Sequence, residues 1–294
     1  MNETVLYNVW HIEAYGFLVL AYFFLGGMAG GSFLVSAFTR IYGKEEYKDI
    51  TKIGAISSII LVAIAGLCLL VDLGQPQRVF FLLTKFHVHS PVSWGTLIIG
   101  LFSLCNLIYL YYLLVAKDDK KTRLWGKIGI VFAVLLTSYT GLLLSMGKAR
   151  PLWHSAIMPP LFLVSGSIAG LALISLVANL LGRYSPDHEV MGTLRRALVI
   201  LILIDIFFLS DMYVLYVGLS EAHEIALLLI AGKFAFLFWG VELLLGSVLP
   251  VIILYTKKLS RTTTWQIVAS GLAIIGVFTM RYIILIIGQY LPIS

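Results

Sequence analysis

Long apolar stretches alternate with short polar ones along the whole chain. Eight of the apolar stretches are long enough to cross a bilayer core of about 30 Å, which takes roughly 20 helical residues. The pattern predicts an all-α polytopic membrane protein, a single integral domain over residues 1–294 with eight transmembrane helices. We expect these helices to form two four-helix bundles. The predicted helices are 12–41, 53–71, 94–116, 128–146, 160–181, 197–218, 225–255 and 264–288.

Composition agrees with this pattern. The chain is 60% hydrophobic and 12% charged, and its mean hydropathy is +0.97. No soluble domain of 294 residues would stay in solution with that balance.

The basic residues predict the orientation of the helices. Only Arg78, Lys85, Lys148 and Arg150 fall on one side of the predicted membrane. Because lysine and arginine are retained on the cytoplasmic side, both termini and the loop 72–94 are predicted to lie outside a cytoplasmic (inner) membrane. The net charge of +6 is spread over short loops, so no nucleic-acid partner is expected. The loops after helices one, three, five and seven hold Arg40, Lys44, Lys48, Lys52, Lys117, Lys120, Lys121, Arg123, Lys127, Arg183, Arg195, Arg196, Lys257, Lys258 and Arg261.

The loop after the second helix carries more polar chemistry than a simple connection needs. Gly74 and Pro76 are expected to end the helix, since glycine tolerates left-handed geometry and proline cannot donate to the helical ladder. Asp72 and Arg78 therefore stand where a helix leaves the membrane. An ordinary interhelical loop is the alternative interpretation.

Two further features are candidates for a binding site. Gly26/Gly30 and Gly27/Gly31 form two stripes without side chains on the first helix, which suits close helix packing or, alternatively, a flat cofactor ring. Tyr139 lies about two turns inside the outer surface, so its hydroxyl needs a partner. That partner is a ligand or, more commonly, a backbone carbonyl.

Five charged residues interrupt the last three predicted helices. Each costs about 2.5–3.5 kcal/mol on insertion scales, so each should face the bundle and find a partner or water. Structural ion pairing and a proton route are both open interpretations. Asp211, Lys233 and Arg281 are predicted in the outer half of the membrane, Glu242 nearer the middle and Asp205 in the inner half.

The histidines and cysteines argue against a resident metal. A membrane cytochrome needs paired axial histidines within facing helices, so we expect no haem. Cys68 and Cys105 lie in apolar runs without metal-ligand spacing, and we interpret them as core residues. All six histidines fall at predicted helix ends or in loops: His11, His87, His89, His154, His188 and His223.

Several motifs together resemble the NrfD/polysulfide-reductase membrane-subunit family. The resemblance is strong to about residue 180 and looser beyond. It implies an anchor of eight to ten helices without redox metals of its own, which exchanges electrons between menaquinone or another quinone and a peripheral iron–sulfur subunit. A molybdopterin catalytic subunit often acts on the terminal substrate. The motifs are 25–31 (LGGMAGG), 72–78 (DLGQPQR), 90–95 (SPVSWG), 139–141 (YTG) and 151–153 (PLW).

The resemblance also implies a quinone pocket at the outer end of the first four helices. Tyr139 matches the tyrosine of that pocket, and Asp72 matches the acid of the helix-two turn. Tyr22 stands where the polysulfide-reductase subunit has a histidine, and His11 and Glu13 are the other polar residues nearby.

The chemistry expected of this pocket is proton handling at the quinone oxygens. Tyr139 would hold one oxygen, and Asp72 would pass a proton outward through Glu13 or His11. Gly27 and Arg78 complete the predicted binding set. A secondary transporter that uses the intramembrane charges and a structural anchor without a site are the alternatives.

Overall fold

The computed structural model describes residues 15–72, 74, 87, 90–147, 150, 152–210, 216–217 and 220–289. Within these residues all regular structure is helical. The elements are α1 (Phe17–Tyr42), η1 (Glu45–Tyr47), α2 (Lys48–Asp72), α4 (Pro91–Tyr111), η3 (Tyr112–Ala116), α5 (Asp119–Ser145), α6 (Met158–Leu180), α7 (Glu189–Leu209), α9 (Ser220–Ile230), η4 (Phe236–Val248), α10 (Leu249–Tyr255), α11 (Lys257–Ser260), α12 (Thr263–Leu285) and η5 (Ile287–Gln289).

Seven helical stretches in the described part of the chain are long and apolar enough to cross a membrane. They contain α1, α2, α4, α5, α6, η4 with α10, and α12. The predicted helix 197–218 corresponds to α7, which carries Arg195, Arg196 and Asp205 among its apolar residues and is not one of the seven. A polytopic helical membrane protein is therefore confirmed, whereas the count of eight spans is not.

Two predicted helices begin too late because their polar starts are capped and helical. α5 begins at Asp119 rather than near residue 128, since the Asp118 carboxylate accepts a hydrogen bond from the Lys121 amide (3.1 Å). α7 begins at Glu189 rather than near 197, where His188 Nδ1 accepts from the Val190 amide (3.2 Å). Side-chain caps of this kind satisfy the first free amides of a helix.

The predicted helix 225–255 is wrong as a single element. It is interrupted by a turn over residues 231–234, which contains Gly232 and Lys233. The Gly232 amide donates to the Leu227 carbonyl (2.8 Å), and a Cβ at Gly232 would collide with the Leu228 backbone. Beyond the turn the polypeptide continues as the π-helical element η4, a rare geometry that is often found at functional sites.

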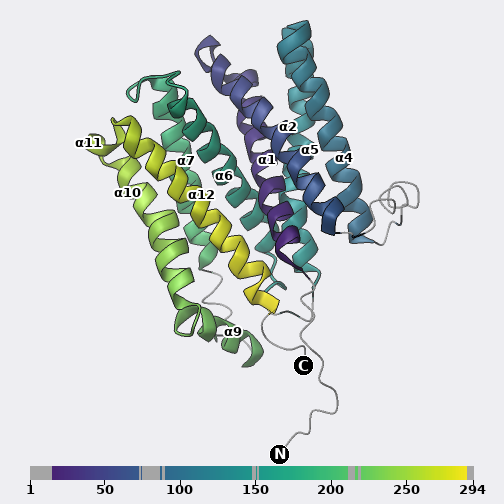
Figure 1. Cartoon of the computed structure of the whole chain (residues 1–294), viewed down its shortest axis with the longest axis vertical. Helices are drawn as coiled ribbons and strands as arrows, with labels where there is room; N and C mark the ends of the chain where they lie inside the picture. The colour runs from purple at the N-terminus through teal and green to yellow at the C-terminus, as the bar shows by residue number, and fades with distance from the viewer. Residues whose placement is uncertain are drawn as a thin grey trace, which may run out of the picture.

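Figure 1 shows the helices as one continuous bundle of roughly parallel and antiparallel rods. α1 packs on α2, α5 and α6, and α6 in turn packs on α7 and α12. A division into two separate four-helix bundles is not confirmed, since α1 and α6 join the two halves. The start of α1 and the end of α12 lie at the same end of the bundle, and the connections α1–α2, α4–α5, α6–α7 and α10–α12 lie at the other. Which end faces outward stays a prediction.

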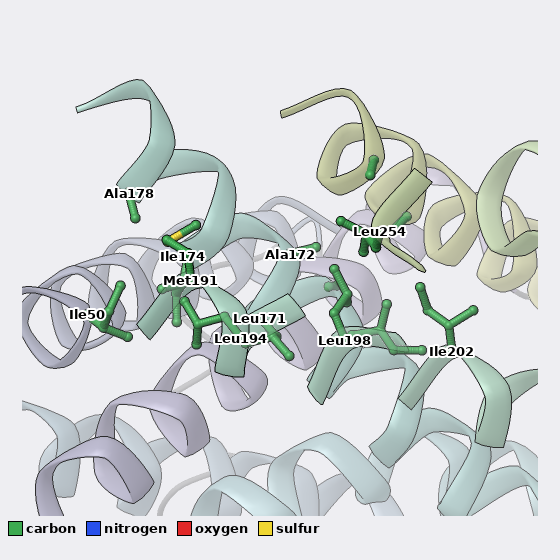
Figure 2. Packing of buried hydrophobic residues seen from close by; sticks show 14 of the residues in the cluster. Ile50, Leu171, Ala172, Ile174, Ala178, Met191, Leu194, Leu198, Ile202 and Leu254 are labelled. Carbon is green, nitrogen blue, oxygen red and sulfur yellow. The ribbon is translucent and has the colours of Figure 1, made fainter. Parts of the chain in front are cut away.

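The apolar core continues across this join. Figure 2 shows Ile50 of α2, Leu171 and Ile174 of α6, and Leu194 and Leu198 of α7 among the buried residues of one cluster. All five are less than 5% exposed. Apolar side chains from three helices thus pack together towards the end of the bundle at which α1 leads into α2 and α6 leads into α7.

The glycines of α1 are used for close helix contact. A Cβ at Gly31 would collide with the carbonyl of Gly166 on α6, and one at Gly30 would collide with Thr137 on α5. Gly170 approaches the backbone of α1 equally closely, at Gly31 and Ser32. Small residues at such positions let backbones touch, which is the main source of helix association in lipid.

This contact predicts a strong effect of volume at Gly31. Gly31→Val should destabilise the protein by about 1–3 kcal/mol or more, because the side chain has no space against Gly166. Thermal unfolding of the purified protein in detergent measures the effect. Gly271→Ala is the matched control: Gly271 lies in α12 with open space around its Cβ position, and the change should be neutral or slightly stabilising. Equal melting temperatures for wild type and Gly31→Val would contradict the packing role.

Candidate functional site

Tyr139 is held in a defined position between α5 and the start of α4. Its side chain is 7% exposed, and its hydroxyl donates a 2.6 Å hydrogen bond to the carbonyl of Pro91. Gly95 lies directly against the hydroxyl, so that any side chain there would collide with it. The partner that the structure provides is a backbone carbonyl, and the lone pairs of the tyrosine oxygen are left to accept a further hydrogen bond.

A cluster of aromatic residues continues from Tyr139 across the same end of the bundle. Tyr22 of α1 is 5% exposed and interacts electrostatically with Tyr139. Tyr15 packs against Phe23 and Trp153, with ring centroids 6.3 and 5.6 Å away. Burial raises the pKa of the Tyr15 phenol, which therefore stays protonated at neutral pH.

The side chain of Gln289, just after α12, is hydrogen-bonded to the backbone just before α1. Its side-chain oxygen accepts from the Tyr15 amide (3.0 Å), and its side-chain nitrogen donates to the Tyr15 carbonyl (3.1 Å). Trp153 Nε1 donates to the Ile284 carbonyl (2.6 Å), and Arg150 donates to the Gln289 carbonyl (3.1 Å). These contacts tie the loop before α6 and the start of α1 to the end of α12.

An apolar groove of about 290 Å³ runs between α2 and α4. Thr96 and Ile99 of α4 form one wall, directly after Gly95, and Gly66 and Leu69 of α2 form the other. The volume is near the lower end of small-molecule sites, about 300–1,000 Å³. Gly66 and Gly100 have open space at their Cβ positions, so the groove is widest where side chains are missing.

The other residues predicted for this pocket are only partly brought together. Asp72 is the last residue of α2 and is exposed. Within the described residues no hydrogen bond or ion pair joins Asp72 to Tyr139. His11, Glu13 and Arg78 lie outside the described residues, as does Asp211.

Gly27, the remaining predicted pocket residue, lies against Arg281. A Cβ at Gly27 would collide with the guanidinium, so the space beside this glycine is filled by a side chain of α12. Arg281 is only 1% exposed. Its Nη1 donates to the Phe23 carbonyl, and its Nη2 donates to the Phe162 carbonyl and to Ser165 Oγ, both at 3.2 Å.

Two buried carboxyl groups accompany Arg281. Asp205 of α7 is 6% exposed and Glu242 of η4 is 3% exposed. Asp205 interacts electrostatically with both Arg281 and Glu242. Each carboxyl group has one buried oxygen without a hydrogen-bond partner in the described part of the chain. A buried acid–base cluster thus joins α7, η4 and α12.

Lys233 does not belong to this cluster. It lies in the turn that interrupts the predicted helix 225–255. A residue in this turn does not follow the helical repeat, and the Lys233 side chain is exposed. Its ammonium group lies 4.9 Å from the centre of the Phe234 ring. The prediction of a bundle-facing lysine inside a helix is wrong.

Sequence reasoning missed the residues that hold this architecture together. The Phe162 carbonyl and the Ser165 hydroxyl accept hydrogen bonds from Arg281, and the Gln289 side chain bonds the backbone of Tyr15. A polar side chain in an apolar helix signals that partners exist, but carbonyl partners have no sequence signature. Among the described residues, no group of three or more His, Cys, Asp or Glu side chains is placed to hold a metal ion.

The fold and the cluster define a polytopic helical membrane protein with polar and aromatic residues gathered at one end. Comparison with known proteins then identifies the family: the model "Polysulphide reductase, NrfD" matches residues 7–292. The chain belongs to the NrfD/polysulfide-reductase family of membrane subunits of respiratory oxidoreductases.

Several curated relatives cover most of the sequence. The Hdr-like menaquinol oxidoreductase integral membrane subunit of Archaeoglobus fulgidus is 30% identical over 278 residues, covering 90% of this chain and 68% of the relative. The C component of polysulfide reductase from Wolinella succinogenes is 26% identical over 306 residues, covering 96% and 94%. Protein NrfD of Escherichia coli is 25% identical over 321 residues, covering 98% and 99%.

The buried acid–base cluster predicts an asymmetric mutational response. Arg281→Met should destabilise the protein by about 2–6 kcal/mol, because it leaves the Phe23 and Phe162 carbonyls buried without their donor, at about 1–3 kcal/mol each, and removes the positive charge near Asp205. Adding Asp205→Asn should recover part of that loss. Thermal unfolding of wild type, both single variants and the double variant gives the coupling energy. Strictly additive losses would contradict a direct interaction between the two residues.

Proposed function

We propose that the protein binds menaquinone or a related quinone at the end of the bundle that carries Tyr139. The observation that supports this most directly is the fixed Tyr139 hydroxyl beside Gly95, on the helix that also forms one wall of the apolar groove between α2 and α4. One relative is named a menaquinol oxidoreductase subunit, which agrees with such a ligand. A buried, oriented hydroxyl among aromatic side chains is the kind of polar group that fixes a mostly apolar ligand.

Each residue at this end has a distinct task. A bound quinone supplies two-electron, two-proton exchange. The Tyr139 hydroxyl donates to Pro91, and its oxygen can therefore accept from a quinol hydroxyl while the ring stays in place. Asp72, exposed at the end of α2, is the group suited to receive a proton and release it to water. Ile99 of α4 and Leu69 of α2 give the neighbouring groove apolar walls that suit a quinone ring or tail.

The electrons leave through partners on the outer face. We propose a peripheral iron–sulfur subunit and a molybdopterin catalytic subunit, as the family resemblance implies. This protein then contributes quinone chemistry and anchoring, and the terminal substrate is bound elsewhere in the complex. His11, Glu13 and Arg78 keep their proposed places near the quinone.

A second candidate function is a proton route through Asp205 and Glu242. The observation that favours it is the pair of buried carboxyl oxygens without partners in the described part of the molecule, one of them on a π-helical element. Such a route would accompany quinone chemistry, or it would serve a secondary transporter. Loss of proton movement with retained quinol oxidation in Glu242→Gln would favour the route.

Tyr139→Phe should weaken quinol binding several-fold, since one neutral hydrogen bond contributes about 0.5–1.5 kcal/mol. Quinol affinity of the purified protein and quinol-linked electron transfer in the assembled complex are the measurements. Tyr109→Phe is the matched control, because Tyr109 of α4 is also buried and bonds Ser36 at 3.1 Å towards the opposite end of the bundle. Both variants should lose similar stability, and only Tyr139→Phe should lose affinity. Unchanged affinity in Tyr139→Phe places the pocket elsewhere.

Asp72→Asn should act on turnover more than on binding. The substitution keeps the shape of the side chain and removes its ability to accept a proton at neutral pH. We expect at least about a tenfold loss of quinol-linked turnover, in line with the contribution of a general base. Glu46→Gln removes one exposed carboxylate at the opposite end and should leave turnover unchanged. Normal turnover in Asp72→Asn would exclude this residue as the proton acceptor.

A further inference from the structure

A basic cavity lies at the end of the bundle opposite Tyr139. It consists of two adjoining hollows of about 340 and 230 Å³, which share Arg40, Glu45, Lys48, Thr51 and Asp119. The walls come from the end of α1, the start of α2, η3 and the start of α5. In Figure 1 these ends lie together at the top of the bundle, where α1 leads into α2 and α4 leads into α5.

The lining has a surplus of positive charge. Its two acids are already used: Asp119 pairs with Arg40, and Glu45 lies 3.8 Å from Lys48. Four further basic side chains line the cavity, and none has an ion-pair partner within the described residues: Lys44, Lys52, Lys117 and Arg123. Clustered like charges repel one another, so a counter-charge in the cavity would be stabilising.

Arg40 adds a donor without an acceptor. Its Nη2 is taken by Asp119, but its Nε is buried and has no hydrogen-bond partner in the described part of the chain. A buried N–H group without a partner loses the hydrogen bonds that water would give it, which is unfavourable. The planar guanidinium group matches the oxygens of a phosphate, which would satisfy this donor.

The backbone of Lys117 has an uncommon conformation at the cavity wall. Lys117 has a φ of 51°, a left-handed conformation that is uncommon outside glycine and asparagine. It ends the π-helical turn η3 and places the residue in the cavity wall. The unfavourable geometry persists because the surrounding structure holds it.

The remaining wall is apolar and faces the lipid side of the bundle. Leu113 and Leu114 line the cavity directly. Val115 next to them is 67% exposed, and Tyr42 at the end of α1 is 77% exposed. A free inorganic ion would gain nothing from this apolar wall, whereas the acyl chains of a lipid would.

We infer that this cavity binds the phosphate group of an anionic phospholipid, with its acyl chains along Leu113 and Leu114. Basic pockets between helix ends on the cytoplasmic side are the usual place for such headgroups, and the predicted orientation puts this end there. The site is separate from Tyr139 and does not rest on the proposed quinone chemistry. Its role would be to fix the helix ends in the leaflet.

The test is lipid binding to the full-length protein in neutral detergent, followed by native mass spectrometry. The probes are dioleoyl phosphatidylglycerol, dioleoyl phosphatidylcholine and inorganic phosphate. Phosphatidylglycerol should bind roughly tenfold more tightly than phosphatidylcholine, because each basic residue near an anionic headgroup contributes about 1 kcal/mol. Millimolar inorganic phosphate should not displace it.

The variant removes two unpaired charges and keeps the backbone. In Lys52→Gln/Lys117→Asn, asparagine tolerates the left-handed conformation that residue 117 requires. Phosphatidylglycerol affinity should fall roughly tenfold. Lys257→Gln/Lys258→Gln removes the same charge from α11, an exposed basic segment of the same end, and should keep its affinity within about twofold.

Four results would overturn the inference. They are equal affinity for the two lipids, displacement by inorganic phosphate, an equal loss in the control variant, and unchanged affinity in the double variant. If the double variant does not purify, single substitutions of Lys44, Lys52 and Arg123 to glutamine replace it. Unchanged phosphatidylglycerol affinity in all three would be equally decisive.

Discussion

The guanidinium group of Arg281 is the interaction on which the packing of this bundle depends. It reaches from α12 to carbonyls on α1 and α6 and also faces Asp205 on α7. A buried arginine in an apolar environment is costly unless its donors find partners, and here both terminal nitrogens do so whereas Nε has no partner among the described residues. The glycine at position 27 makes the arrangement possible, since it is the absence of a side chain there that brings the α1 backbone within reach.

Three regions around Arg281 differ in the kinds of side chain that they contain. Towards Tyr139 the bundle is rich in buried aromatic side chains. Around Asp205 and Glu242 it holds buried acidic groups. At the far end it has a cavity lined by basic side chains. These regions are in contact, since α6 packs against both α1 and α12 and Arg281 also joins α12 directly to α1.

Most of the helices were predictable from the sequence because length and apolarity determine membrane spans. The errors occur where local chemistry competes with hydropathy. The caps at Asp118 and His188 extend helices into polar sequence, and Gly232 with Lys233 interrupts an apolar run. At the site, Tyr139 could be named from its depth and from the family resemblance. Its partner Pro91 could not be named, because a carbonyl acceptor belongs to a backbone position rather than to a residue type.

The clamp between Gln289 and Tyr15 has a consequence for biogenesis. Its two residues are separated by 274 positions, so the first helix to enter the membrane meets its final neighbour only after nearly the whole polypeptide has been synthesised. Until then the backbone of Tyr15 and Gly27 of α1 lack their partners on α12, whereas Gly30 and Gly31 can already pack on α5 and α6. The start of α1 therefore reaches its final contacts later than the middle of the same helix, and a ribosome that stalls late would leave this end of the bundle incomplete.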